Sequence, residues 1–210
     1  MIAARLRHAR RVVCLGAHPD DIEIGCGGLL LRLAGRGDVQ VDGLVLTGQQ
    51  GRAEEARQSL PRFVPDATVE VAGLPDGMLP GHWSAVKETM EQFGQRHPAD
   101  VVLAPRTDDA HQDHRLVAEL ASTVWRDSLM LRYEIPKWDG DLGAPNHFVA
   151  LDRDTAGRKV RLLNECFPSQ ATRDWWDDEL FLALLRLRGM ETRAPYAEGF
   201  FVTKALLDVG

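Results

Sequence analysis

Cysteine is scarce in this chain. Its 210 residues contain only three, Cys14, Cys26 and Cys166, and no two of them have the spacing of a CxxC motif. An odd number of dispersed cysteines argues against a disulfide framework, and the missing CxxC spacing argues against a cysteine-ligated zinc site. We therefore expect the protein to work in a reducing compartment, the cytoplasm.

Long apolar runs and an excess of basic residues are also missing. No run approaches the roughly 18 apolar residues that a membrane-spanning helix needs, so no membrane association is expected. The basic start followed by apolar residues 12–17 imitates a signal peptide, but that apolar run is too short, and we expect no signal peptide. The chain has 25 Lys+Arg against 31 Asp+Glu, a formal net charge of −6. Nucleic acid is not an expected partner, because gripping its phosphates requires a basic face.

What the sequence does contain is a regular alternation of strand-like and helix-like segments. Short apolar or β-branched runs predict strands at 12–16, 39–46, 69–72, 101–104, 129–135 and 148–151. Helices are predicted at 29–34, 52–60 (ended by Pro61), 83–93, 116–124, from 154 onwards, and at 174–188 between a capping Asp174 and a terminating Gly189. This alternation predicts an α/β fold with a mostly parallel sheet flanked by helices. With no linker or repeat, residues 1–210 are expected to form a single domain.

Two polar loops follow the first and fourth predicted strands. They read Ala17-His-Pro-Asp-Asp21 and Asp108-Asp-Ala-His-Gln-Asp-His114. In open parallel sheets ligands bind at the carboxyl ends of the strands, where both loops are expected. Imidazole nitrogens and carboxylate oxygens suit zinc, and Fe²⁺ or Co²⁺ would also fit such a site. The loops offer more groups than the three ligands of a catalytic zinc, and this surplus favours catalysis over a closed structural site.

Neither loop is diagnostic alone, because HxxH spacing often arises by chance and an HPDD segment also suits a capped turn. Together, however, His18-Pro-Asp-Asp21, Glu23-Ile-Gly-Cys-Gly-Gly28 and His111-Gln-Asp-His114 resemble the PIG-L/LmbE-like family of zinc-dependent de-N-acetylases. Weaker landmarks follow in the family's order, among them Thr47-Gly48, Leu74-Pro-Asp-Gly77, Tyr133-Glu-Ile-Pro136 and Phe167-Pro-Ser-Gln170. The chain departs from the family at Ile22, where Glu is usual, and at Gln112, where Pro is usual. Neither departure removes a candidate site residue.

The resemblance implies a Rossmann-like fold and hydrolysis of the acetamide of an N-acetylglucosamine-type group with one zinc ion. The zinc ligands carried over to this sequence are His18, Asp21 and His114. Asp20 would be the general base, taking a proton from the attacking water. His111, expected as a cation, would stabilise the oxyanion or act as an acid. Asp113 would orient a histidine, as carboxylates behind metal ligands commonly do.

Substrate contacts are assigned less directly. Arg52 would clamp the sugar or an anionic aglycone, or lie solvated at the start of a helix. Asp108 and Asp109 would bind sugar hydroxyls or cap the following turn. Trp138, in a polar loop, would stack on a sugar ring. Trp175 is expected to pack against the last helix. Glu134 and Glu198 match family landmarks without an assigned catalytic role, and a structural ion pair is the default expectation for each. For His147, a structural or rim role and a catalytic role both stay open.

The sequence therefore predicts a zinc-dependent de-N-acetylase that acts on an N-acetylated amino sugar or its conjugate and releases acetate. Two other functions stay open: a zinc amidase acting on a non-sugar acylated amine, and a non-catalytic sugar-binding module. The binding module is disfavoured because all the candidate ligands and the candidate base are present. The expected partner is a small-molecule amino-sugar conjugate, and the resemblance also allows a homo-oligomer.

Overall fold

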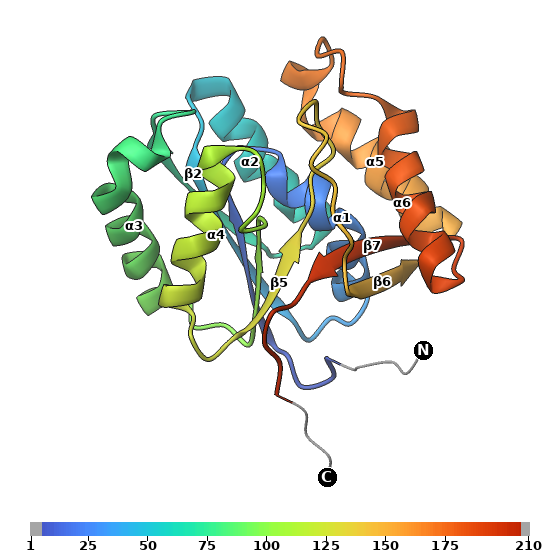
Figure 1. Cartoon of the computed structure of the whole chain (residues 1–210), viewed down its shortest axis with the longest axis horizontal. Coiled ribbons are helices and arrows are strands. Elements are labelled where there is room, and N and C mark those ends of the chain that lie inside the picture. The colour runs from blue at the N-terminus through green and yellow to red at the C-terminus, as the bar shows by residue number, and fades with distance from the viewer. Residues whose placement is uncertain (1–5, 207–210) are drawn as a thin grey trace.

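A seven-stranded sheet with helices on both faces forms the fold of the computed structural model, which describes residues 6–206 (Figure 1). The strands are β1 (Arg11–Gly16), β2 (Gln40–Thr47), β3 (Thr68–Leu74), β4 (Val101–Ala104), β5 (Leu129–Tyr133), β6 (His147–Leu151) and β7 (Tyr196–Phe201). The α-helices are α1 (Asp21–Ala34), α2 (Gln50–Phe63), α3 (Trp83–Arg96), α4 (Gln112–Val124), α5 (Arg153–Cys166) and α6 (Asp178–Thr192). Two 3₁₀ turns, η1 (Leu79–His82) and η2 (Pro168–Gln170), complete the elements. Within residues 6–206, no helix combines the length and apolarity that crossing a membrane requires.

The strand order is β3-β2-β1-β4-β5-β7-β6, and strands β1 to β5 run parallel to their neighbours. Only β7 runs antiparallel, to both β5 and β6. The chain builds outward from β1 to β3 and then returns to place β4 on the other side of β1. The carboxyl ends of β1 and β4 therefore meet at the switch point of a doubly wound sheet, the usual ligand site of this architecture. The predicted mostly parallel, Rossmann-like fold is confirmed.

The continuous apolar run of β1 is explained by burial on both faces. Val12 and Cys14 point into the core beneath α1, α2 and α5, whereas Val13 and Leu15 point into the core beneath α3 and α4. Figure 1 shows α3 and α4 together on one face of the sheet. A hydroxyl in the core also ties two strands together, because Tyr133 of β5 donates to the carbonyl of Leu15 at 2.6 Å.

Several predicted helix boundaries were wrong, including the start of α1, which begins at Asp21 instead of Leu29. Helix α2 continues past Pro61 to Phe63, since this proline lies in the last turn and its missing N–H removes only one intrahelical bond. Helix α6 begins at Asp178 instead of near Asp174, because Asp177 caps it by accepting from the N–H of Glu179 at 2.7 Å.

The expected stop at Gly189 was also wrong, because this glycine lies inside α6. A Cβ at this position would lie 2.7 Å from the backbone of Tyr196, so glycine is needed for close packing against the start of β7. The helix ends instead at Arg193, which adopts the left-handed conformation at φ 61°. Strand β7 itself was not predicted.

Glu198 and Lys159 stabilise a kink in α1. Helical geometry breaks at Cys26 (φ −140°), which leaves backbone groups on either side of the break without helical partners. The Glu198 carboxylate accepts the N–H groups of Gly28 and Leu29 at 2.6 and 2.7 Å. The Lys159 ammonium donates to the carbonyl of Ile24 at 2.6 Å and to Glu198 at 2.7 Å. This buried pair holds the first turns of α1, which carry Asp21, and Glu198 therefore forms the structural ion pair that was its default expectation.

Substituting Glu198→Gln leaves the ammonium of Lys159 buried without its counter-charge. We expect the free energy of unfolding, measured by urea denaturation, to fall by about 3–5 kcal/mol. The matched control is Glu165→Gln, which breaks an exposed ion pair with Arg62 and is expected to cost less than about 1 kcal/mol. Equal effects of the two substitutions would contradict this account of the kink.

Candidate metal centre

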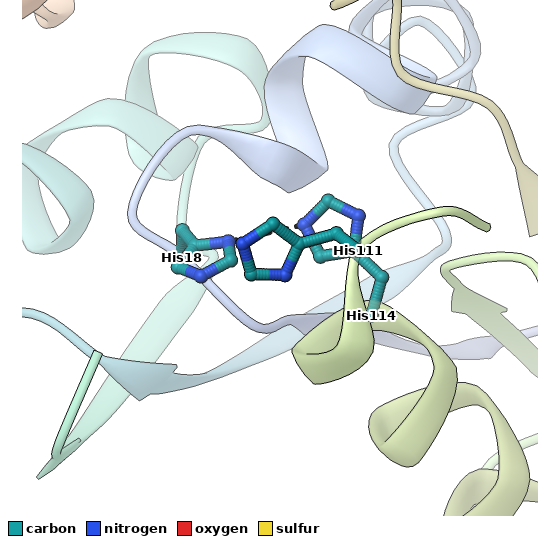
Figure 2. Close-up of side chains that lie close together, drawn as sticks. All are labelled: His18, His111 and His114. Atoms are coloured by element: carbon teal, nitrogen blue, oxygen red, sulfur yellow. Dashed lines mark hydrogen bonds between the residues drawn. The ribbon is translucent and has the colours of Figure 1, made fainter. Parts of the chain in front are cut away.

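The two polar loops meet where β1 and β4 lie side by side. Figure 2 shows His18, from the loop after β1, pointing toward His111 and His114 at the start of α4. The centroids of the three rings lie 4.7 to 5.0 Å apart. The rings line a cavity of about 280 Å³ together with Asp20 and Arg52. Side chains from distant parts of the chain therefore share one pocket, as the sequence predicts.

Backbone contacts hold the loop after β1 in place. Thr47 donates both its N–H and its hydroxyl to the carbonyl of Ala17, at 3.0 and 2.7 Å. Gly48 adopts a φ of 117°, and a Cβ there would lie 2.9 Å from Cγ of Pro19. The Thr47-Gly48 pair thus fixes the loop that presents His18.

Three ligand atoms form a compact triangle. His18 Nδ1 lies 3.0 Å from His114 Nε2, and Asp21 Oδ2 lies 3.5 and 3.3 Å from these two nitrogens. Ligands bound to zinc at 2.0–2.2 Å with tetrahedral geometry are about 3.3 Å apart, so these three atoms have the spacing that one metal ion requires. Two nitrogens and one carboxylate oxygen, with room left for water, also make a suitable donor set.

Electrostatics at the triangle favours a positive charge. Burial disfavours a charged imidazole, but the Asp21 carboxylate and further acidic neighbours outweigh burial. They raise the pKa of His18 to about 12 and that of His114 to about 9. A divalent cation placed between the two rings would be favoured by the same carboxylates in place of these protons.

His111 is a further candidate ligand, since it offers a ring nitrogen within 4.8 Å of nitrogens of His18 and His114. Its Nδ1 accepts the backbone N–H of Asp113 at 3.2 Å, which makes His111 the N-cap of α4. An accepting Nδ1 in a neutral ring places the proton on Nε2. Burial and the neighbouring histidines lower the pKa of His111, which favours the neutral ring over the expected cation.

Asp109 contacts the ring nitrogen of His114 that faces away from the triangle. Its Oδ2 lies 3.1 Å from Nδ1 of His114, the nitrogen that faces away from the triangle. Its Oδ1 accepts the N–H of His111 at 2.8 Å and lies 3.0 Å from the ammonium of Lys137. Burial raises the pKa of Asp109, but these partners outweigh burial and lower it to about 2. The sequence did not single out this role, because it depends on which of two adjacent aspartates turns inward.

Asp113 and Asp76 lie on the far side of His18. Asp113 Oδ2 is 3.5 Å and Asp76 Oδ1 is 3.2 Å from Nε2 of His18. The fully buried Asp113 also accepts the N–H groups of Gly77 and Leu79, at 2.8 and 3.1 Å. Asp113 therefore contacts a histidine, as expected, and anchors the loop that carries Asp76. Asp76 belongs to the Leu74-Pro-Asp-Gly77 landmark, whose position beside His18 was not foreseen.

Asp20 is the carboxylate beside the triangle that is not part of it. It is 5% exposed and occupies the N-cap position of α1 without capping the helix with its side chain. Its partner is Arg52, whose Nη2 donates to Oδ2 at 3.0 Å. Burial raises the pKa of Asp20 above its usual range, although Arg52 opposes the shift. A carboxylate with a raised pKa facing a metal pocket is suited to proton transfer.

Some of the remaining candidate residues line the cavity, and others lie away from it. Arg52 and Trp138 line the cavity, whereas the Asp108 side chain is 74% exposed, pairs with Arg106 at 3.0 Å and does not line the cavity. Glu134 forms a buried bidentate pair with Arg188, at 2.7 and 2.8 Å, and is structural. His147 lies exposed on the edge strand β6, and its ring contacts neighbouring Asn146.

The pocket places a His/Asp cluster suited to a metal ion at the usual ligand site of an α/β fold. Residues 13–125 match the family model described as GlcNAc-PI de-N-acetylase. The "uncharacterized deacetylase YaiS" of Escherichia coli is 31% identical over 137 residues, an alignment covering 60% of this chain and 74% of the relative. The family model spans more than half of the chain, so the chain belongs to the GlcNAc-PI de-N-acetylase (PIG-L) family and is an enzyme of the deacetylase type.

Solved structures share the fold. The N,N'-diacetylchitobiose deacetylase of Pyrococcus horikoshii superposes with a TM-score of 0.72 at 21% identity, covering 94% of this chain and 85% of the other. GalB of Pseudomonas putida KT2440, a 4-carboxy-2-hydroxymuconate hydratase, superposes with a TM-score of 0.79 at 16% identity, covering 96% and 99%. Because the fold carries both activities, the reaction must be argued from the site.

Removing the carboxylate behind His114 tests the geometry of the site. We expect Asp109→Asn to weaken zinc binding by about 10- to 100-fold, since the imidazole loses the partner that fixes its orientation. Competition with a chromogenic chelator measures the affinity. The control is the neighbouring exposed Asp108→Asn, for which unchanged affinity is expected. A loss of affinity in the control alone would contradict the assignment.

Proposed function

We propose that this protein is a zinc-dependent hydrolase that removes the N-acetyl group from an N-acetylglucosamine-type amino sugar or its conjugate and releases acetate. The observation that carries the proposal is a triangle of two imidazole nitrogens and one carboxylate oxygen, 3.0 to 3.5 Å apart, beside a second, buried carboxylate. Family membership supports the amide hydrolysis, and the donor set supports zinc. The cytoplasm remains the proposed compartment.

The ligands we assign are His18 Nδ1, Asp21 Oδ2 and His114 Nε2. When bound there, zinc lowers the pKa of a water molecule to about 7 and polarises the amide carbonyl. His111 Nε2 is the competing third ligand. We prefer Asp21, because its Oδ2 lies 3.5 and 3.3 Å from the two histidine nitrogens, close to the separation expected between two ligands of a tetrahedral zinc ion.

Asp20 is the proposed general base. Its carboxylate takes a proton from the water as the oxygen bonds to the carbonyl carbon. It then returns that proton to the nitrogen as the C–N bond breaks, and acetate and a free amine result. Arg52 holds the carboxylate through the 3.0 Å hydrogen bond from Nη2. A carboxyl group with a raised pKa performs both transfers near neutral pH.

His111 is the proposed donor to the developing oxyanion. Because Nδ1 is engaged by the N–H of Asp113, the Nε2–H group faces the cavity as a fixed donor. A neutral imidazole suits this position, since a cation beside the metal would be repelled. Donors of this kind contribute about 3–4 kcal/mol to the barrier reduction in comparable sites.

Asp20→Asn tests the general base. The substitution keeps the size of the side chain and removes its basicity, so we expect kcat to fall by about 10²- to 10⁴-fold while one zinc per chain is retained. Acetate release from N-acetylglucosamine conjugates and metal analysis of the same sample are the measurements. Asp154→Asn, on the exposed face of α5, serves as the control. Hydrolysis at the parental rate by a zinc-loaded Asp20→Asn protein would sink the assignment.

His111→Ala separates the two ligand sets. With Asp21 as third ligand, the variant is expected to bind zinc with affinity within about threefold of the parent, while kcat falls by about 10²- to 10³-fold. Zinc affinity and kcat are measured on one preparation. A large loss of zinc affinity would instead make His111 a ligand.

The rival function within enzymes is a zinc amidase that acts on a non-sugar acylated amine. A panel of acetylated sugars and simple acetylated amines, assayed for free primary amine, distinguishes the two. Preference for the simple amines would favour the amidase.

A further inference from the structure

Besides the histidines and carboxylates, the cavity is lined by two tryptophans. Trp138, in the loop after β5, and Trp175, in the connection between α5 and α6, both line it. Their ring centroids lie 6.0 Å apart at an interplanar angle of 74°. These two segments also lie close together at the top of Figure 1. Although its ring meets Trp175, Trp138 is 66% exposed, and burial in the core does not explain a large aromatic residue there.

Packing against other aromatic side chains fixes the position of Trp175. Trp175 packs edge-on against Trp176, at 5.5 Å between centroids, and Trp176 packs against Phe167 and Phe181 in the core. Trp175 therefore caps a continuous aromatic stack, in keeping with the expectation that it packs near the last helix. It also reaches the pocket, which the sequence did not reveal.

The Trp138 loop is anchored by Lys137 and by Gly143. The Lys137 ammonium lies 3.0 Å from Asp109 and 3.1 Å from Asp141. The carbonyl of Gly143 accepts from Arg188 at 2.8 Å. The indole of Trp138 is thus an exposed ring on a fixed support, and such pre-organised aromatic surfaces bind ligands at low entropic cost.

Within residues 6–206, three Arg or Lys side chains line the cavity, and two of them are already engaged. Arg52 pairs with Asp20 at 3.0 Å, and Lys137 is surrounded by acidic groups, including the rim residue Asp139 at 3.9 Å. Arg173 is exposed, and its guanidinium makes no hydrogen bond or ion pair with any residue between 6 and 206. In a chain of net charge −6, this leaves an available positive charge in the lining of the cavity that Trp138 and Trp175 also line.

We propose that Trp138, Trp175 and Arg173 form a subsite for the aglycone, the part of the substrate beyond the acetamido sugar, and that it takes an aglycone with a flat apolar face and a negative charge. This inference rests on the proposed function, because the sugar itself must lie at the metal end. The flat face stacks against the indole of Trp138, and the anionic group pairs with the guanidinium of Arg173.

The test compares three substrates: 4-carboxyphenyl N-acetyl-β-glucosaminide, its neutral 4-methylphenyl analogue and free N-acetylglucosamine. The zinc-loaded parent is expected to favour the carboxylate over the neutral aryl glycoside by about threefold to fivefold in kcat/KM, the size of an exposed ion pair. Arg173→Gln should bring this ratio to about one. Trp138→Ala should lower kcat/KM for both aryl glycosides by about fivefold relative to free N-acetylglucosamine.

Matched controls lie outside the cavity. Arg158→Gln removes another exposed arginine, on α5, and Trp83→Ala removes another exposed tryptophan, at the start of α3. Both are expected to keep the parental ratios. Unchanged selectivity in Arg173→Gln, or equal effects of Trp138→Ala and Trp83→Ala, would overturn the subsite.

Failure of the proposed function gives a different result. If the parent hydrolyses none of the three compounds, the affinities of the zinc-loaded protein for the two aryl glycosides, measured by calorimetry, still test the subsite. Charge-selective binding that depends on Arg173 would then support the subsite and contradict only the deacetylase proposal. Binding without charge selectivity would contradict the subsite as well.

Discussion

Strands β1 and β4 lie side by side and parallel at the centre of the sheet, and that adjacency brings together the two loops that carry His18, Asp21 and His114. The nitrogens of His18 and His114 belong to residues 96 positions apart, yet they lie 3.0 Å from each other. The chain reaches this arrangement because β2 and β3 are built on the far side of β1 before β4 returns. The Thr47 contacts to Ala17 and the kinked helix α1 then hold the first loop against the second.

Charge organises the centre around that frame. Carboxylates surround the two histidines of the triangle: Asp21 between them, Asp113 and Asp76 beyond His18, and Asp109 beyond His114. Such a concentration of negative charge in a buried place is unfavourable unless positive charge compensates it. Protons on the imidazoles supply part of that compensation, and a divalent cation would supply it more completely. Asp20 stays outside this arrangement because Arg52 engages it instead.

Much of the fold could be predicted from the sequence, because parallel strands buried on both faces read as apolar runs. The run Val101–Ala104 was predicted with its observed ends. The errors arose where a residue's neighbours in space decide its role. Gly189 looked like a helix stop, but the backbone at Tyr196 requires it inside α6. Strand β7 was missed because it is antiparallel and carries Glu198, whose partners at Gly28 and Leu29 lie 170 and 169 residues away.

At the candidate site too, some features could be predicted from the sequence and others could not. The motif residues His18, Asp20, Asp21, His111 and His114, predicted from their types, spacing and family resemblance, line one cavity. Asp109 was not distinguished from Asp108, since only the structure shows which of the two turns inward to His114. The sequence also does not reveal that Nδ1 of His111 accepts from the N–H of Asp113. Roles that depend on hydrogen bonds between loops need coordinates.

The most direct test of the central claim is a crystal structure of the zinc-loaded protein, with anomalous data collected at the zinc absorption edge. The account predicts one strong anomalous peak, about 2.0–2.2 Å from His18 Nδ1, Asp21 Oδ2 and His114 Nε2. Asp20 should lie close by without binding the ion. A peak that Asp21 or either histidine does not ligate, or zinc held elsewhere on the molecule, would contradict it.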